Sequence, residues 1–162
     1  MKAAYIEEHG GPEVLRYGDV QDPIAGAGEV LVDVYAASVN GADWKVRSGA
    51  SGEITSFPYV LGRDFSGIVS ALGKGTNDFN VGDAVFGVCA GGQEGAYAEK
   101  IAVKASIIAR KPDSLSHIEA ASLALIGLTA LISIEDTLAL KSGETILIQG
   151  GAGGVASFAI QL

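Results

Sequence analysis

Near its end the chain reads Glu144-Thr145-Ile146-Leu147-Ile148-Gln149-Gly150-Gly151-Ala152-Gly153-Gly154-Val155-Ala156. The apolar, β-branched run Thr145–Ile148 predicts a buried parallel strand. A glycine cluster follows directly, and residues 155–162 predict the first turns of a helix. A strand, a tight glycine turn and a helix in this order are typical of a site that binds the pyrophosphate of a dinucleotide.

Within this stretch, residues 151–156 fit the pattern G-x-G-x-x-G/A, in which each small residue has a physical role. We expect Gly151 to allow the tight turn, and Gly153 to let the backbone approach a pyrophosphate. Ala156 would let the helix lie close to the strand, and the helix N-terminus would offer N–H groups to the phosphates. The predicted cofactor-binding residues of this loop are Gly151, Gly153, Gly154 and Val155. A glycine-rich turn without a ligand is the alternative.

The sequence stops at Leu162, six residues past this motif. A dinucleotide-binding unit takes about 30 residues, with a residue that reads the ribose about 20 positions further on. We therefore expect the sequence to be the first part of a longer protein.

Composition indicates an ordered, globular protein. Of its 162 residues 48% are hydrophobic, and its 23 glycines point to many turns. The formal net charge of −8 argues against nucleic acid or an anionic membrane as a partner. A single cysteine, Cys89, rules out an internal disulfide and a zinc cluster of several cysteines, and is compatible with a reducing cytoplasm.

Neither the N-terminus nor the longest apolar run of the chain predicts insertion into a membrane. The N-terminal run Met1–Tyr5 lacks the apolar core of a signal peptide and leads directly into a strand. Residues 120–134 are nearly all apolar, but 15 residues are short for a bilayer span and fit a buried helix better. We therefore predict a soluble, cytoplasmic protein.

The first two thirds of the chain alternate short apolar runs with glycine turns. This pattern predicts an all-β, partly closed barrel. It includes a short helix over residues 40–49 and a flexible Gly/Ser stretch over residues 49–56. The predicted strands cover residues 2–8, 14–20, 29–38, 61–69, 81–87, 96–103 and 106–109.

The pattern changes to helix after Pro112. Ser116 followed by Glu119 is a capping box that opens a helix, which we expect to run past Gly127 toward Asp136. We therefore divide the chain into a β part and an α/β part, residues 1–112 and 113–162.

Several short motifs occur in a fixed order along the whole chain. They are residues 10–15, 28–32, 39–40, 61–64, 81–85, 95–99, 127–130 and 151–156, followed by Gln161-Leu162. In this order they resemble the N-terminal half of a medium-chain dehydrogenase/reductase, most closely the zinc-independent quinone oxidoreductases and alkenal reductases.

The resemblance implies a mainly β, GroES-like substrate domain over residues 1–112. Residues 113–162 would then be the helix and the first strand–turn–helix of an incomplete Rossmann domain. The fold class of the whole chain would be α+β. The resemblance also implies NADPH or NADH bound in the cleft between the domains, a small quinone or enone as substrate, and a homo-oligomer.

The resemblance argues against a metal. Zinc alcohol dehydrogenases of the same superfamily carry a cysteine where this chain has Asn40, and a His-Glu pair where it has Arg63-Asp64. Asparagine and arginine cannot replace a thiolate and an imidazole as zinc ligands. His9 and His117 have no ligand-like neighbours in the sequence and are expected to be surface or helix-start residues.

Without a Lewis acid, hydride delivery to a quinone or to an α,β-unsaturated carbonyl is easier than reduction of a simple ketone. We predict Asn40 as the hydrogen-bond donor near the nicotinamide or the substrate carbonyl; a turn or helix cap is the alternative. Lys45 falls where relatives place a residue facing the cleft, with a solvated surface lysine as the alternative. Thr129 resembles a cofactor contact, or is a helix threonine bonded to its own preceding carbonyl.

The remaining polar candidates are expected to be structural. Asp64 should bond loop backbone, Tyr97 should pack the barrel, and Cys89 should be an inert buried thiol. The leading hypothesis is the N-terminal portion of a zinc-independent NAD(P)H-dependent oxidoreductase, inactive in this truncated form. The alternatives are a catalytically inactive binding protein of the same fold, and an interaction module that works as this short chain.

Overall fold

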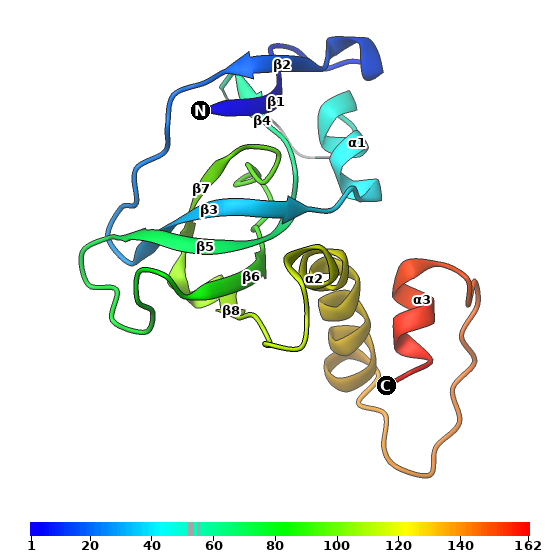
Figure 1. The fold of residues 1–162 in the computed structure, drawn as a ribbon. Coiled ribbons are helices and arrows are strands. Elements are labelled where there is room, and N and C mark those ends of the chain that lie inside the picture. Colours follow the sequence, from blue (N-terminus) through cyan, green and yellow to red (C-terminus); the bar gives the residue numbers. More distant parts are fainter. Residues whose placement is uncertain (52–53, 55) are drawn as a thin grey trace.

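The computed structural model describes residues 1–51, 54 and 56–162. Its strands form two antiparallel sheets, and the helices of the C-terminal third lie below them in Figure 1. The smaller sheet has the order β2-β1-β4. Its strands are β1 (Lys2–Ile6), β2 (Arg16–Asp19) and β4 (Tyr59–Val60), and the short 3-10 helix η1 (Pro12–Val14) precedes β2.

The larger sheet has five strands in the order β7-β3-β5-β6-β8. They are β3 (Glu29–Ala37), β5 (Asp64–Leu72), β6 (Ala84–Val88), β7 (Lys100–Lys104) and β8 (Ile108–Arg110), with the 3-10 helix η2 (Ala105–Ile107) before β8. A backbone hydrogen bond of 2.7 Å from Ala4 N to Tyr97 O links the two sheets. The predicted mainly β, partly closed barrel is confirmed.

Alternating side chains of the larger sheet form the core, as the period of two along a strand requires. Val30 and Val32 on β3 are fully buried, as are Phe65 and Val69 on β5. The two strands approach so closely at Gly67 that an added Cβ would lie 2.1 Å from the carbonyl oxygen of Asp33. Only glycine fits there, so Gly67 fixes the contact between β3 and β5.

Helix α1 (Gly41–Ser48) follows β3 and ends at Gly49, whose φ of 79° is left-handed and favours glycine. Helix α2 (His117–Leu131) begins with the predicted capping box: Ser116 Oγ accepts from the Glu119 N–H at 3.2 Å. It continues into the π-helix η3 (Ile132–Thr137), as expected for a helix running toward Asp136. Helix α3 (Gly154–Ala159) follows the glycine loop.

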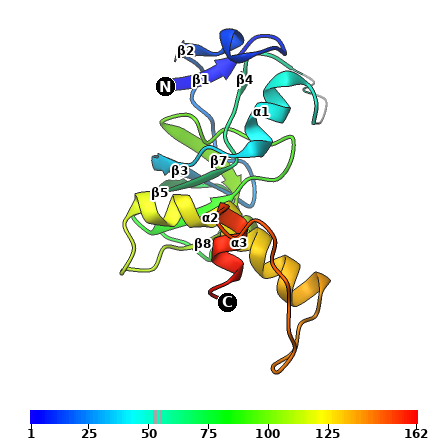
Figure 2. The ribbon, with the colours of Figure 1, turned by 90° about the vertical axis from the view of Figure 1, so that its right-hand side faces the viewer.

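Helix α2 connects the barrel to the C-terminal residues. It packs on β3, β5 and β6 and also contacts α3. Figure 2 shows that α2 bends partway along its length. The predicted boundary at residue 112 lies between β8 and α2.

The segment His117–Thr137 is long and apolar enough, by length and composition, to cross a membrane, with a mean hydropathy of 1.7. The core helix of a soluble protein has the same character. Here the small residues Ala120, Ala121 and Ala124 are buried, whereas Ile118 and Leu128 are exposed. The prediction of a buried helix therefore holds for one face.

The predicted buried strand Thr145–Ile148 is wrong. These residues have no strand partner and form an extended link, and Leu147 is 84% exposed. The physical reason is that a strand needs a neighbour to accept its backbone hydrogen bonds, and both sheets of the barrel are built from earlier residues.

Two further differences concern the barrel. The short strand β4 was not predicted, and the strand predicted at 96–103 begins only at Lys100. The Gly/Ser stretch predicted at 49–56 includes residues 52, 53 and 55, which lie outside the described residues.

Candidate functional site

Asn40 lies at the N-terminus of α1, three residues after the end of β3. Its backbone N–H donates to Asp43 Oδ2 at 2.7 Å, so Asn40 and Asp43 are arranged as a capping box. The side chain of Asp43 is buried and also accepts from the Tyr97 hydroxyl at 2.7 Å. Tyr97 thus packs in the barrel, as expected, and also supports the cap.

The Asn40 carboxamide makes its own contacts. Nδ2 donates to Asp64 Oδ1 at 2.9 Å and to Ser38 Oγ at 3.1 Å. An asparagine has two N–H donors, so both are used inside the protein. The remaining polar atom of the carboxamide is its oxygen, which is an acceptor and which the capping box turns toward the Asp43 N–H. The expectation that Asn40 donates to a carbonyl oxygen therefore needs the side chain to turn over.

Asp64 is the first residue of β5 and is 1% exposed. It bonds side chains and a helical N–H, instead of the loop backbone that the sequence suggested. Its partners are Ser38 Oγ at 2.8 Å, Asn40 Nδ2 and the backbone N–H of Leu125 on α2 at 3.3 Å. Burial raises the pKa of Asp64, the three hydrogen bonds oppose this rise, and the nearby Asp43 adds to it.

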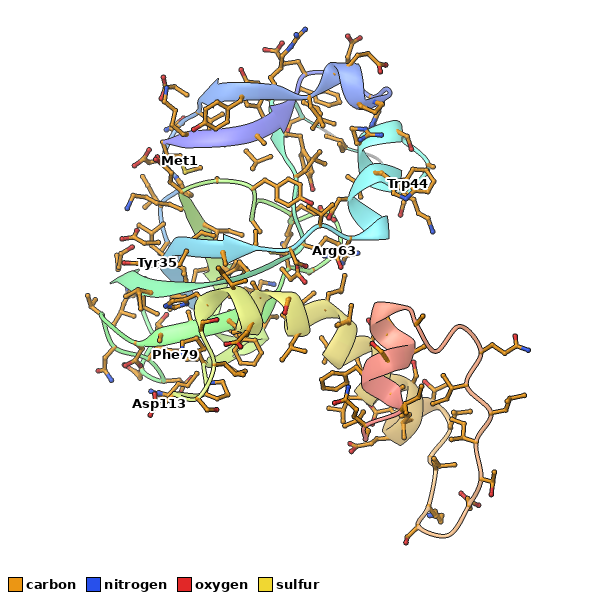
Figure 3. The ribbon with its side chains drawn as sticks, turned by 45° about the vertical axis from the view of Figure 1, so that its right-hand side comes forward. Met1, Tyr35, Trp44, Arg63, Phe79 and Asp113 are labelled. Carbon is orange, nitrogen blue, oxygen red and sulfur yellow. The ribbon has the colours of Figure 1, made fainter. Side chains whose placement is uncertain are left out.

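Lys45 is exposed on α1, and its Nζ lies 5.9 Å from the centre of the Trp44 ring. Figure 3 shows Trp44 on the side of α1 that points away from the strands. The structure does not bring Lys45 into contact with Asn40 or Asp64 among the described residues. This placement resembles the solvated lysine of the alternative interpretation.

The glycine loop lies beside α2. Gly150, one residue before the fingerprint, carries the left-handed φ of 73°, so the tight turn is at Gly150 and not at Gly151. Gly153 is the N-cap of α3, and its N–H donates to Gly150 O at 2.8 Å. Gly153, Gly154 and Val155 are exposed, and Gly151 is half-buried.

Two glycines let α3 pack closely on α2. A Cβ on Gly154 would lie 3.2 Å from Ile126 Cγ2, and a Cβ on Gly127 would lie 3.3 Å from the ring of Phe158. The expected close packing of Ala156 on a strand is replaced by this helix–helix contact, because the strand is not formed. Thr129 is exposed, and its hydroxyl donates to the Leu125 carbonyl oxygen at 2.7 Å, as in a plain helix threonine.

Three consecutive residues of α2 contact both parts of the candidate site, the Asp64–Asn40 pair and the helix after the glycine loop. Leu125 contacts the Asp64–Asn40 pair through its backbone N–H, and Ile126 and Gly127 contact α3 beside the glycine loop. The structure therefore brings Asn40 and the loop 151–155 to the same helix.

A second polar cluster surrounds Arg63, which Figure 3 labels. Its Nη2 donates to the Cys89 carbonyl oxygen at 3.2 Å, and its Nε lies 3.8 Å from the carboxylate of Glu94. The Glu94 side chain is 1% exposed and accepts from the Tyr59 hydroxyl. Arg63, whose side chain is partly exposed, thus forms an ion pair with the buried Glu94.

Cys89 and the two histidines have structural surroundings. Burial, with a smaller contribution from Glu94, raises the pKa of Cys89 to about 12, so the thiol is inert at neutral pH. His117 Nδ1 lies 2.8 Å from Ser66 Oγ, and His9 Nδ1 lies 3.2 Å from Arg47 O. Over residues 1–51, 54 and 56–162, no group of three or more His, Cys, Asp or Glu side chains could hold a metal ion.

Sequence reasoning missed Ser38, Asp43, Tyr59 and Glu94 as parts of these networks. The spacing of Asn40 and Asp43, three residues apart before a helix, was a local signal that could have found Asp43. Ser38, Tyr59 and Glu94 have no comparable signal, because their partners are distant in the chain.

Comparison with known proteins identifies the barrel. Residues 26–113 match the family model "Alcohol dehydrogenase GroES-like domain". Among curated proteins, quinone oxidoreductase of Sus scrofa is 34% identical over the whole chain, which covers 49% of that protein. The mitochondrial NAD(P)H oxidoreductase RTN4IP1 of Homo sapiens is 36% identical, and the chain covers 46% of it. The chain thus spans about half the length of the curated relatives it matches.

Solved structures give the same result. Quinone oxidoreductase of Coxiella burnetii superposes with a TM-score of 0.89 at 39% identity, over 99% of this chain and 52% of that one. Escherichia coli quinone oxidoreductase, solved with NADPH, superposes with a TM-score of 0.90 at 32% identity, over 99% and 48% of the two chains.

Proposed function

Starting from the fact that this chain belongs to the medium-chain dehydrogenase/reductase superfamily, with an alcohol dehydrogenase GroES-like domain, we propose that it is the N-terminal portion of a zinc-independent oxidoreductase. This enzyme transfers a hydride from NADPH, or NADH, to a quinone or an α,β-unsaturated carbonyl. One observation carries the proposal. In α2, Leu125 donates to Asp64, the hydrogen-bond partner of Asn40, and the next two residues, Ile126 and Gly127, contact α3 after the glycine loop.

The residues of the glycine loop fit the pyrophosphate of a dinucleotide. The first turn of α3 leaves N–H groups at Gly154 and Val155 without a carbonyl partner in the helix. Gly153 adds no side chain that would cover them, and all three residues are exposed. Gly151, Gly153, Gly154 and Val155 would therefore hold the phosphates. Thr129, on the exposed side of α2, would contact the cofactor after its hydroxyl leaves the Leu125 carbonyl oxygen.

Asn40 and Lys45 are the proposed residues of the reacting end. When bound, the reduced nicotinamide supplies the hydride. With both N–H groups tied to Ser38 and Asp64, the Asn40 oxygen can accept a hydrogen bond and so orient a carboxamide or a hydroxyl group. Lys45 is exposed, so its ammonium group can neutralise an oxyanion on the substrate.

Metal-free chemistry is supported by the donor types. Asn40 and Arg63 stand where zinc dehydrogenases carry ligands, and Arg63 is occupied by Glu94. We further propose a cytoplasmic homo-oligomer without nucleic acid or membrane partners, in keeping with the net charge of −8 and the buried free Cys89.

The proposal is tested with a completed chain, made by joining residues 1–162 to the C-terminal half of a related quinone oxidoreductase. NADPH oxidation is followed with a panel of quinones and enones, beside the 162-residue chain alone. We expect turnover by the completed chain and none by the short chain. Asn40→Ala should lower the rate of turnover more than it weakens NADPH binding.

If the completed chain binds NADPH but oxidises it with none of these acceptors, an inactive binding protein of the same fold replaces the proposal. Tight NADPH binding with turnover by the 162-residue chain alone would contradict the expectation that the short chain is inactive.

A further inference from the structure

Asp64 is a buried carboxylate that the proposed chemistry does not use directly. Its hydrogen bonds come from three neutral donors on three segments: Ser38 after β3, Asn40 at the start of α1, and the backbone N–H of Leu125 in α2. Burying a carboxylate costs free energy unless its oxygens are fully hydrogen-bonded. The three donors must therefore be held in place around Asp64.

The donors around Asp64 determine which way Asn40 faces. The Ser38 hydroxyl has one hydrogen, and it donates to Asp64 at 2.8 Å. Its oxygen is then free to accept from Asn40 Nδ2, whose second hydrogen goes to Asp64 Oδ1. A carboxylate only accepts, so the Asn40 nitrogen, and not its oxygen, must face Asp64.

The same carboxylate contacts α2 in its interior. The Leu125 N–H lies 3.3 Å from Asp64 Oδ2, in a helix that Figure 2 shows to be bent. A side chain that takes a helical N–H is a recognised cause of such bends. The next two residues, Ile126 and Gly127, contact Gly154 and Phe158 of α3. Asp64 therefore links the orientation of Asn40 to the placement of the glycine loop.

We propose that Asp64 is a positioning residue, whose carboxylate fixes the orientation of the Asn40 carboxamide and the position of α2 beside the barrel. This inference rests on the proposed function for its effect on the reaction, but the geometry itself can be tested without any activity.

The charge on Asp64 offers the test. The titratable groups that interact with it electrostatically are Asp43 on α1, Tyr97 and Cys89. Burial raises the pKa of Asp64 above its ordinary value. Protonation converts one acceptor position into an O–H donor, so the Asn40 carboxamide and the Leu125 N–H must both respond.

The experiment is a pH titration of the ¹⁵N-labelled 162-residue chain, followed by NMR at the Asn40 side-chain NH₂ and the Leu125 backbone N–H. We expect both signals to shift together with one midpoint, above the usual aspartate pKa of about 3.9. In Asp64→Asn both shifts should disappear, whereas Asp113→Asn, the same change at an exposed carboxylate, should leave them unchanged.

Ser38→Ala provides a second test that keeps the carboxylate, in case Asp64→Asn does not fold. It removes a donor to the charged form, so the common midpoint should rise. Signals that titrate separately, that persist in Asp64→Asn, or that keep their midpoint in Ser38→Ala would overturn the proposal.

In the completed chain, Asp64→Asn should lower kcat roughly 10- to 100-fold with little change in the KM for NADPH, because a misplaced contact group costs rate more than binding. An unchanged kcat would overturn the positioning role in the reaction. If the unsubstituted completed chain is inactive with every acceptor, the proposed function fails, while the NMR titration still decides the geometry.

Discussion

Removal of the Tyr97 hydroxyl should show how strongly the cap beneath Asn40 is held. This hydroxyl donates at 2.7 Å to Asp43 Oδ2, and the Asp43 side chain is 4% exposed. Asp43 Oδ1 has no partner among the described residues, so Tyr97 and the Asn40 N–H are the donors on which this carboxylate depends. Burial and the bond to Asp43 raise the pKa of Tyr97, so the hydroxyl is protonated over the whole physiological range.

Tyr97→Phe keeps the ring in its contacts with Ile6, Val46 and Leu61 and deletes only the donor. A hydrogen bond to a charged group contributes about 1.5–3 kcal/mol, and its loss leaves a buried acceptor without its partner. We therefore expect the free energy of unfolding to fall by about 2 kcal/mol, and the melting temperature to fall by roughly 4–8 °C.

Urea unfolding followed by Trp44 fluorescence, together with thermal unfolding, measures this change. Tyr17→Phe is the matched control, because Tyr17 is 77% exposed and should tolerate the change. A loss below about 0.5 kcal/mol for Tyr97→Phe, the size of a neutral surface substitution, would show that the Tyr97 hydroxyl does not stabilise the cap.

Three further predictions follow from the same structure. Elemental analysis should find no stoichiometric zinc and a chelator should leave the melting temperature unchanged, because Asn40 and Arg63 cannot serve as zinc ligands; tightly held zinc would overturn the zinc-independent assignment. Ser116→Ala should cost about 1 kcal/mol in unfolding free energy, because it removes the acceptor of the Glu119 N–H; Ser114→Ala is the control, and equal costs would contradict the capping role. The exposed apolar residues of the C-terminal third, with Leu147 84% exposed, should make the 162-residue chain dimerise or aggregate; light scattering from a clean monomer at high concentration would contradict this.

Local features could be predicted from the sequence. The capping box of Ser116 and Glu119 involves residues three apart, and both of its halves are formed in the structure. The strand at 29–38 was predicted from side chains that alternate every two residues, and β3 matches it within one residue. Signals of this kind depend on neighbours along the chain, which the sequence contains.

The polar networks could not be predicted, because their partners are far apart in the sequence. Asp64 meets Asn40 across 24 positions and Leu125 across 61 positions. Only the pairing of β3 with β5 and the packing of α2 on the sheet bring these atoms together. Glu94 and Tyr59, 35 positions apart, meet for the same reason.

The wrong strand at Thr145–Ile148 has a related cause. Its composition favours a buried strand, but pairing is a property of two segments, and the described residues supply no second one beside it. For Thr129 the sequence left two interpretations, and the bond to the Leu125 carbonyl oxygen shows the plain helical one in this structure.

We propose that Asn40 and the glycine loop belong to one cofactor site. The most direct measurement is an NADPH titration of the ¹⁵N-labelled completed chain, followed at the amides of Gly153 and Gly154 and at the Asn40 side-chain NH₂. We expect all three signals to shift and to saturate with a single Kd. If the glycine amides saturate while the Asn40 signal does not move, or if neither responds, Asn40 and the glycine loop do not form one cofactor site.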